Sequence, residues 1–196
     1  MEKVKDFYYY KAKREKYPAR SVYKLEEIDR KYRLIKKGKR ILDMGAAPGS
    51  WSKYCCSRVG DKGLVVAVDR GKVKIGEYNN MIFIQQDVFS MDVARLKELT
   101  PFFDIVLSDL APATTGIRNA DQAKSLELAI RAFEIADQAL APGGHFVCKI
   151  FQGPDVKINL LDKIRRSFEW AKTVKPKSTR KESFELYIVA LNKINA

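Results

Sequence analysis

Short apolar runs, separated by helical or loop sequence, set the pattern of this chain. Five of them are residues 40–43, 64–68, 81–84, 103–107 and 145–151. Continuous runs of this kind are typical of strands that are covered on both faces, as in a parallel sheet. Two further runs, at 170–174 and 184–191, are joined by a loop and not by a helix. We therefore expect these last two strands to be antiparallel.

Sequence with helical periodicity separates the runs. In residues 18–32 apolar side chains recur three and four positions apart, which predicts a helix with Lys24 beside its apolar stripe. Further helices are expected over residues 50–58, 121–140 and 156–168. The alternation predicts an α/β fold with a seven-stranded, mostly parallel sheet, an antiparallel last strand and helices on both faces. Ligands of such sheets bind beyond the carboxyl ends of the strands.

The turn after the first apolar run is built from small residues. Asp43 closes the run, and the stretch from Gly45 to Gly49 leads into a helix near Trp51. Small side chains let the backbone approach a ligand, and the unpaired N–H groups of a helix start point into the same space. The spacing differs from the dinucleotide-binding G-x-G-x-x-G, so a tight turn that binds nothing is the alternative.

Four apolar runs are closed by acids, namely Asp43, Asp69, Asp87 and Asp109. One such carboxylate could be a helix cap, but four should line one edge of the sheet. Asp69 follows Gly49 by 20 residues, the position of an acid that binds ribose hydroxyls. Asp87 could accept a hydrogen bond from an adenine amino group, and Asp43 could attract a cation. S-adenosylmethionine has a ribose, an adenine and positive charge without phosphate, so it fits these acids better than ATP or NAD.

The net charge of +13 is concentrated near both ends of the chain. Residues 1–40 hold fifteen Lys or Arg against six Asp or Glu, with aromatic residues interleaved, and residues 171–181 hold five basic residues and no acid. This pattern suits a polyanion such as RNA, although solvated faces on a generally basic protein are the alternative. We expect residues 1–17 to form a mobile basic arm and residues 18–196 to form a single domain.

Other features narrow the class of protein. No apolar run approaches the length of a membrane span, and the N-terminus lacks the apolar region of a secretory signal. The three cysteines lack metal-ligand spacing, and the single histidine, His145, is expected to be structural. We therefore expect a cytoplasmic protein without a membrane partner or a metal site.

Five stretches of the sequence resemble the FtsJ family of RNA ribose 2′-O-methyltransferases. They are residues 19–25, 42–51, 107–112, 148–153 and 183–187. The resemblance implies a Rossmann-like, S-adenosylmethionine-dependent methyltransferase fold. One departure is Ser50, where many members of the family have Gly; Ser is small enough to fit.

The family carries a Lys-Asp-Lys-Glu tetrad. By motif, the tetrad falls on Lys24, Asp109, Lys149 and Glu185, with Glu182 as a rival for the last position. The family's cofactor positions fall on Gly49, Trp51, Asp69, Asp87 and Asp109, to which the small-residue turn adds Asp43 and Gly45. Lys149 is expected to act as a general base or to orient the hydroxyl. Desolvation, Lys24 and the sulfonium would lower its pKa, whereas the two carboxylates would raise it.

The resemblance implies 2′-O-methylation of a uridine ribose in large-subunit (23S-type) ribosomal RNA, with the large ribosomal subunit as the partner. We expect the protein to be a monomer. Relatives act on tRNA, and this substrate is the first alternative. The compact chain, without added domains, favours the ribosomal type. A second alternative, of another class, is a ribosome-assembly factor that binds RNA without catalysis; the intact tetrad argues against it.

Overall fold

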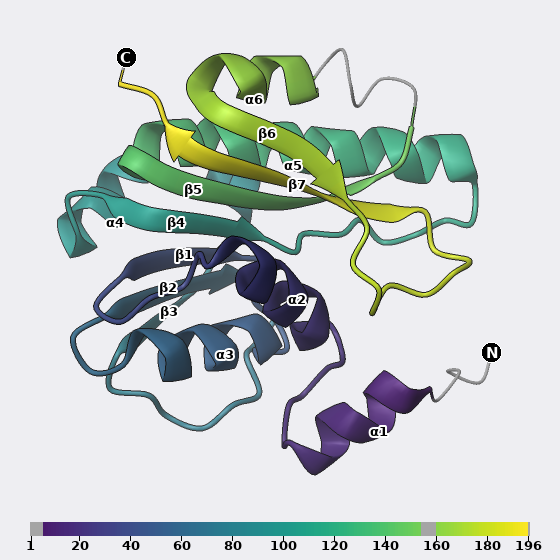
Figure 1. Cartoon of the computed structure of the whole chain (residues 1–196), viewed down its shortest axis with the longest axis horizontal. Helices are drawn as coiled ribbons and strands as arrows, with labels where there is room; N and C mark the ends of the chain where they lie inside the picture. Colours follow the sequence, from purple (N-terminus) through teal and green to yellow (C-terminus); the bar gives the residue numbers. More distant parts are fainter. Residues whose placement is uncertain (1–5, 154–159, 196) are drawn as a thin grey trace.

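The computed structural model describes residues 6–153 and 160–195. Its strands form one seven-stranded sheet in the order β3-β2-β1-β4-β5-β7-β6 (Figure 1). The strands are β1 (Arg40–Met44), β2 (Leu64–Asp69), β3 (Met81–Gln85), β4 (Phe103–Ser108), β5 (Leu140–Phe151), β6 (Phe168–Val174) and β7 (Glu185–Lys193). β1 to β5 are parallel, and β7 runs antiparallel to both β5 and β6. The predicted fold class is confirmed.

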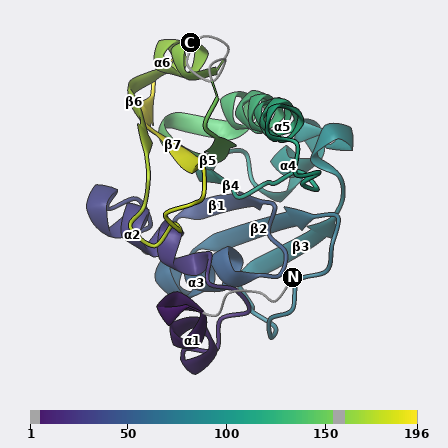
Figure 2. The ribbon, with the colours of Figure 1, turned by 90° about the vertical axis from the view of Figure 1, so that its right-hand side faces the viewer.

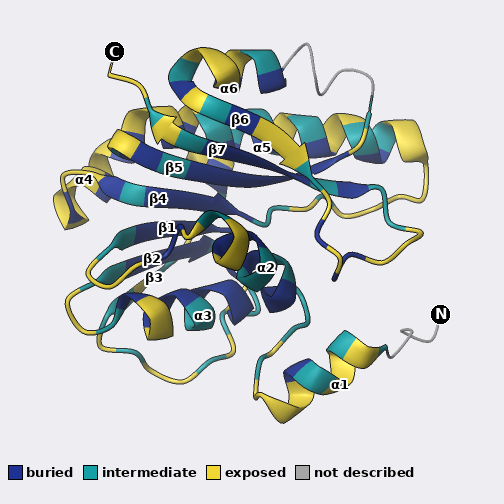
Figure 3. Ribbon diagram, viewed as in Figure 1, coloured by how far each residue is buried: buried dark blue, intermediate teal, exposed yellow. Residues whose placement is uncertain are grey.

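Helices cover both faces of this sheet (Figures 1 and 2). One face is covered by α2 (Val22–Tyr32) and α3 (Ser50–Val59). The other is covered by α4 (Val93–Leu99), α5 (Arg118–Ala139) and α6 (Asp162–Ser167), with the short 3₁₀ helix η1 (Val88–Ser90) near α5. Each face has its own apolar cluster, and the central strands between them are buried (Figure 3). Central strands with both faces buried need apolar residues at consecutive positions, and this is the pattern that the sequence shows.

The helix α2 is the element that brings the N-terminal part of the chain to the sheet. Leu25 and Ile28 lie on its buried stripe and pack in the same cluster as Trp51 of α3 and Tyr187 of β7. Lys24 precedes Leu25, so its side chain starts at the edge of the buried face. The packing of α2 therefore fixes where the Lys24 ammonium can reach.

Residues 1–5 of the expected basic arm lie outside the described residues, and the rest of the arm contains a helix that packs on α2. Residues Phe7–Arg14 form α1, and Asp6 caps the helix by accepting a hydrogen bond from the Tyr9 N–H at 3.0 Å. Ala12 is buried against Val22 and Tyr23 of α2. This short apolar contact was not predicted, because the net basic charge of the segment indicated a solvated arm. The proposed boundary between residues 17 and 18 stays a prediction.

Some element boundaries also differ from those expected. α5 begins at Arg118, and β5 begins at Leu140, ahead of the predicted starts at 121 and 145. Leu140 pairs with Phe103 before a shift in register, so a long-range contact extends the strand through the Pro-Gly-Gly segment. The predicted helix over 156–168 falls partly outside the described residues, and its last residue already belongs to β6. None of the helices in the described ranges is long and apolar enough to cross a membrane.

The packing of α2 generates a stability prediction. Leu25 is fully buried, so Leu25→Ala should lower the free energy of unfolding by about 2–5 kcal/mol, through lost apolar contact and a residual cavity. Urea unfolding followed by circular dichroism measures this change. The control is Arg30→Ala at an exposed position of the same helix, which should change stability by less than about 0.5 kcal/mol. Equal effects of the two substitutions would show that α2 does not depend on its buried stripe.

Candidate active site

The small-residue turn after β1 approaches the backbone that follows β4. Gly45 has a φ of +78°, and a Cβ added there would lie 2.7 Å from the Leu110 nitrogen. Any side chain at this position would therefore collide with backbone. The other side of the turn is held by Asp69, whose carboxylate accepts a hydrogen bond from the Ala47 N–H at 2.9 Å. The carboxyl ends of β1, β2 and β4 thus meet around one turn.

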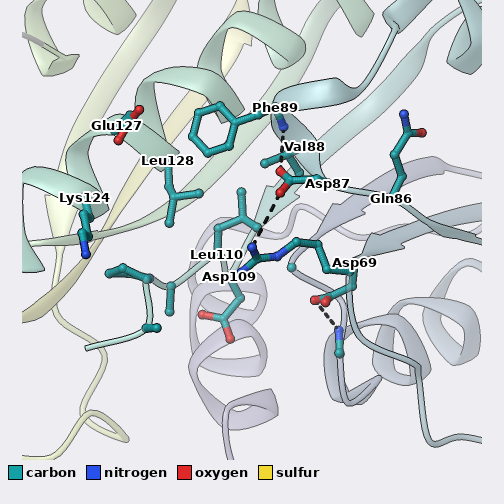
Figure 4. Close-up of a pocket in the computed structure, with 16 residues that line it drawn as sticks. Asp69, Gln86, Asp87, Val88, Phe89, Asp109, Leu110, Lys124, Glu127 and Leu128 are labelled. Carbon is teal, nitrogen blue, oxygen red and sulfur yellow. Dashed lines mark hydrogen bonds and ion pairs between the residues drawn. The ribbon is translucent and has the colours of Figure 1, made fainter. Parts of the chain in front are cut away.

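A cleft of about 540 Å³ opens at these strand ends (Figure 4). Its lining comprises Gly45, Ala47, Asp69, Arg70, Gln86, Asp87, Val88, Phe89, Asp109, Leu110, Ala111, Pro112, Ala113, Lys124, Glu127 and Leu128. The volume is in the range of cofactor sites. Carboxylates of three strand ends, Asp69, Asp87 and Asp109, face it together with the apolar side chains of Val88 and Leu128. This set fits a nucleoside that carries positive charge.

Two of these carboxylates are already oriented by neighbouring groups. Asp69 accepts hydrogen bonds from the Ala47 and Gly71 N–H groups, one on each oxygen. Asp87 accepts from the Phe89 N–H at 2.9 Å and forms a 3.6 Å ion pair with Arg70 (Figure 4). Fixed carboxylates of this kind can bind ribose hydroxyls and an amino group without reorganising.

Asp43, by contrast, does not line the cleft. It is fully buried at the end of β1, where Ser52 Oγ donates a hydrogen bond to Oδ2 at 2.6 Å. Oδ1 has no hydrogen-bond partner among the described residues. Burial raises the pKa of Asp43 to about 7; the Ser52 hydrogen bond opposes this shift, and the charges of Asp109 and Asp69 add to it. Asp43 lies beneath the turn, so direct contact with a cofactor is not available to it in this structure.

Gly49 and Trp51 also lie outside the lining of the cleft. Gly49 caps α3 with a φ of +112°, and an added Cβ would lie 2.7 Å from the Ile75 side chain. The Trp51 side chain is buried, donates from its indole N–H to the Ser21 carbonyl at 2.9 Å and packs on the Tyr187 ring. These two predicted cofactor residues shape the start of α3 and connect it to α2.

The four tetrad residues, in contrast, are brought together. Lys149 Nζ donates to the Asp109 carboxylate at 3.2 Å and to the Asp109 carbonyl at 3.1 Å. Lys24 Nζ donates to Glu185 at 2.5 Å. Pairing of β5 with β7 sets Lys149 opposite Tyr187, and alternation along β7 places Glu185 on the same face. Glu182 is exposed and lies outside this group.

Two opposing effects set the protonation of Lys149. Its side chain is only 9% exposed, and this burial lowers the pKa. The charges of Asp109 and Glu185, with the hydrogen bond to Asp109, outweigh burial and hold the pKa above the usual value of a lysine. Without a ligand, Lys149 is therefore an ammonium at neutral pH. The sequence alone left the sign of this shift open.

Tyr187 is the member of this group that sequence reasoning missed. Its hydroxyl donates to the Asp109 carboxylate at 2.9 Å, and its side chain is fully buried. Burial, with the nearby charges of Asp109 and Glu185, raises the pKa of the phenol well above its usual value. Tyr187 is thus a neutral donor that helps to hold Asp109. Tyr187 lies two residues after Glu185 on the same strand, so the alternation of side chains could have placed both residues on one face.

A second cleft, of about 430 Å³, opens on the other side of the tetrad. Its lining comprises Ala19, Arg20, Ser21, Lys24, Thr179, Arg180, Ser183 and Glu185. Asp109 lines the first cleft, whereas Lys24 and Glu185 line the second. The tetrad therefore lies between two clefts, an arrangement that suits transfer of a group from one bound molecule to another.

Comparison with known proteins agrees with this geometry. The chain is 51% identical over 194 residues to ribosomal RNA large subunit methyltransferase E of Nitratidesulfovibrio vulgaris (strain DSM 19637 / Miyazaki F), with 97% of this chain and 96% of the relative covered. The protein of that name from Syntrophobacter fumaroxidans is 47% identical, with 96% and 95% covered. A solved Plasmodium falciparum structure, assigned as a ribosomal RNA methyltransferase, aligns with a TM-score of 0.80 at 31% identity, covering 92% of this chain and 100% of that one.

The FtsJ-like methyltransferase family matches residues 17–193. This range includes the small-residue turn, every strand of the sheet and all four tetrad residues. The predicted resemblance is confirmed: the chain belongs to the FtsJ-like methyltransferase family.

Proposed function

We propose that the protein transfers a methyl group from S-adenosylmethionine to the 2′-hydroxyl of a uridine in the RNA of the large ribosomal subunit. The observation that carries this proposal is the tetrad between two clefts, one suited to a charged nucleoside and one lined by cationic side chains. Identity near 50% over almost the whole chain to relatives named for large-subunit ribosomal RNA supports the substrate. We expect a monomer in the cytoplasm, with residues 18–196 as the transferase unit.

In this proposal the first cleft holds the methyl donor. Asp69 binds the ribose hydroxyls, Asp87 accepts from the adenine amino group, and Asp109 faces the cationic methionine end. Gly45 lets the turn after β1 lie against the Leu110 backbone, and both residues line the cleft that would hold the donor. When bound, S-adenosylmethionine supplies an electrophilic methyl group on a sulfonium.

Lys149 then positions the acceptor. As an ammonium it cannot take a proton, so its N–H donates to one lone pair of the 2′-oxygen and leaves another directed at the methyl. Asp109 holds this ammonium directly, and Tyr187 holds Asp109. The Lys24–Glu185 pair fixes the rim where the ribose enters. Alignment of this kind supplies a large part of the acceleration. As the methyl–oxygen bond forms, the sulfur–methyl bond breaks and leaves S-adenosylhomocysteine, and the hydroxyl proton passes late to solvent.

The substrate is tested by incubating the protein with methyl-labelled S-adenosylmethionine and either large ribosomal subunits lacking the modification or total tRNA. We expect label in large-subunit RNA, at the ribose, and none in tRNA above the level of a protein-free control. Label in tRNA alone would replace the ribosomal proposal with the tRNA alternative. RNA binding without any transfer would favour the non-catalytic assembly factor.

Replacement of the ammonium tests its role. Lys149→Ala should lower methyl transfer by at least about 10²-fold, because the acceptor loses the group that aligns it. Binding of S-adenosylmethionine, measured by calorimetry, should persist, since Lys149 is not part of the lining of the first cleft. Lys97→Ala on the exposed side of α4 is the control and should leave the transfer rate unchanged. Transfer by Lys149→Ala near the parent rate would remove Lys149 from the mechanism.

The pH dependence separates an orienting ammonium from a general base. Because Asp109 and Glu185 hold the pKa of Lys149 above its usual value, the ammonium persists through neutral and mildly alkaline pH. Single-turnover rates should therefore stay level from about pH 7 to pH 9 and fall only at higher pH. A general base of raised pKa would instead give a rate that rises about tenfold per pH unit over that range.

A further inference from the structure

Two arginines that line the second cleft, beyond the tetrad, share one carboxylate. Arg20, just before α2, and Arg180, in the connection between β6 and β7, both pair with the Asp6 carboxylate. The Arg180 Nε lies 3.4 Å from Asp6 Oδ2, and Arg20 contacts the same oxygen. In Figure 1 the connection between β6 and β7 extends from the sheet toward the side on which α1 lies. Three distant segments thus meet on one carboxylate oxygen.

The two guanidinium groups are close enough to repel each other. Burial lowers the pKa of Arg20, and the charge of Arg180 lowers it further. Two like charges in a half-buried cleft are held together by an anion between them. Asp6 supplies that anion from within the chain, with a single negative charge, the same charge that one RNA phosphodiester carries.

A third observation points to a ligand at this place. Thr179 also lines the second cleft and is 8% exposed. Its Oγ1 is buried without a hydrogen-bond partner among the described residues. A hydroxyl of a cleft that is also lined by two arginines can serve as a partner of a phosphate oxygen.

The cleft itself does not depend on Asp6. The Glu27 carboxylate of α2 accepts a hydrogen bond from the Lys177 N–H at 2.8 Å, and Arg20 donates to the Ser178 carbonyl. These contacts attach the β6–β7 connection to α2 and to the segment just before it. Loss of the Asp6 charge should therefore leave Arg20 and the backbone that carries Arg180 in place.

We propose that Arg20, Arg180 and Thr179 form a subsite for a phosphodiester of the RNA strand next to the target ribose, and that Asp6 occupies it until RNA displaces the carboxylate. The proposal rests on the proposed function for the identity of the strand. Lys24 and Glu185 line the same cleft, so a phosphate held here lies on the strand that enters the tetrad. Asp6 is then a competitor that weakens contact with RNA lacking further binding elements.

The test compares binding of a single-stranded oligouridylate, by fluorescence anisotropy at one fixed salt concentration. Asp6→Asn keeps a side-chain oxygen that can cap α1 but removes the charge, so it should tighten binding by about threefold to tenfold. The matched control is Asp61→Asn, which removes one charge from an exposed turn at the opposite edge of the sheet. It should change the affinity by less than about twofold, because charges beyond the Debye length are screened.

A double-mutant cycle locates the effect. Arg180→Gln should weaken binding, and the gain from Asp6→Asn should shrink in that background, because the two side chains act at one site. Thermal unfolding of each variant confirms that it is folded. An Asp6→Asn affinity no tighter than that of Asp61→Asn, or a gain unchanged by Arg180→Gln, would overturn the subsite while methyl transfer by the parent stands. A parent that neither binds RNA nor transfers methyl would overturn both proposals.

Discussion

The buried ammonium of Lys149 is the constraint on which the site depends. A charge at this depth is tolerated only beside fixed opposite charges, and those come from Asp109 after β4 and Glu185 at the start of β7. β5 lies between β4 and β7 in the sheet. Because β7 is antiparallel, its first residue, and not its last, reaches the edge where β4 and β5 end. The reversed strand is thus what supplies the second carboxylate.

The same constraint explains residues that never touch a ligand cleft. Tyr187 donates to Asp109 and packs on Trp51, and the Trp51 indole donates to the Ser21 carbonyl beside α2. The first turn of α3, the start of α2 and the tetrad carboxylate are therefore joined through two aromatic side chains. Through these contacts Trp51 ties the turn after β1 to the helix that carries Lys24.

The sequence predicted most of the sheet because its strands are buried on both faces, so their apolar character is continuous. The grouping of the acids could also be predicted from the sequence, because the carboxyl ends of parallel strands meet at one edge of the sheet. The burial of each acid at that edge could not be predicted, because it depends on which part of the structure covers each strand end. Asp43 is enclosed beneath the turn, whereas Asp69 faces the cleft, although the two follow similar runs. The start of β5 at Leu140 and the helix α1 depend on long-range contacts that local patterns do not contain.

The geometry of Lys149 limits what the proton of the acceptor can do. Two of the hydrogen bonds of Nζ go to Asp109, one to its carboxylate and one to its carbonyl. An ammonium has three N–H groups, so among the described contacts one direction is left for a substrate oxygen. That single donor can fix one lone pair of the oxygen but offers no acceptor for its hydrogen. In the proposed reaction the hydroxyl would therefore become acidic only as the carbon–oxygen bond forms and the sulfur–methyl bond breaks, and its proton would pass to solvent after the methyl has begun to transfer. A carboxylate pair that keeps Lys149 charged thus favours alignment over deprotonation as the source of rate.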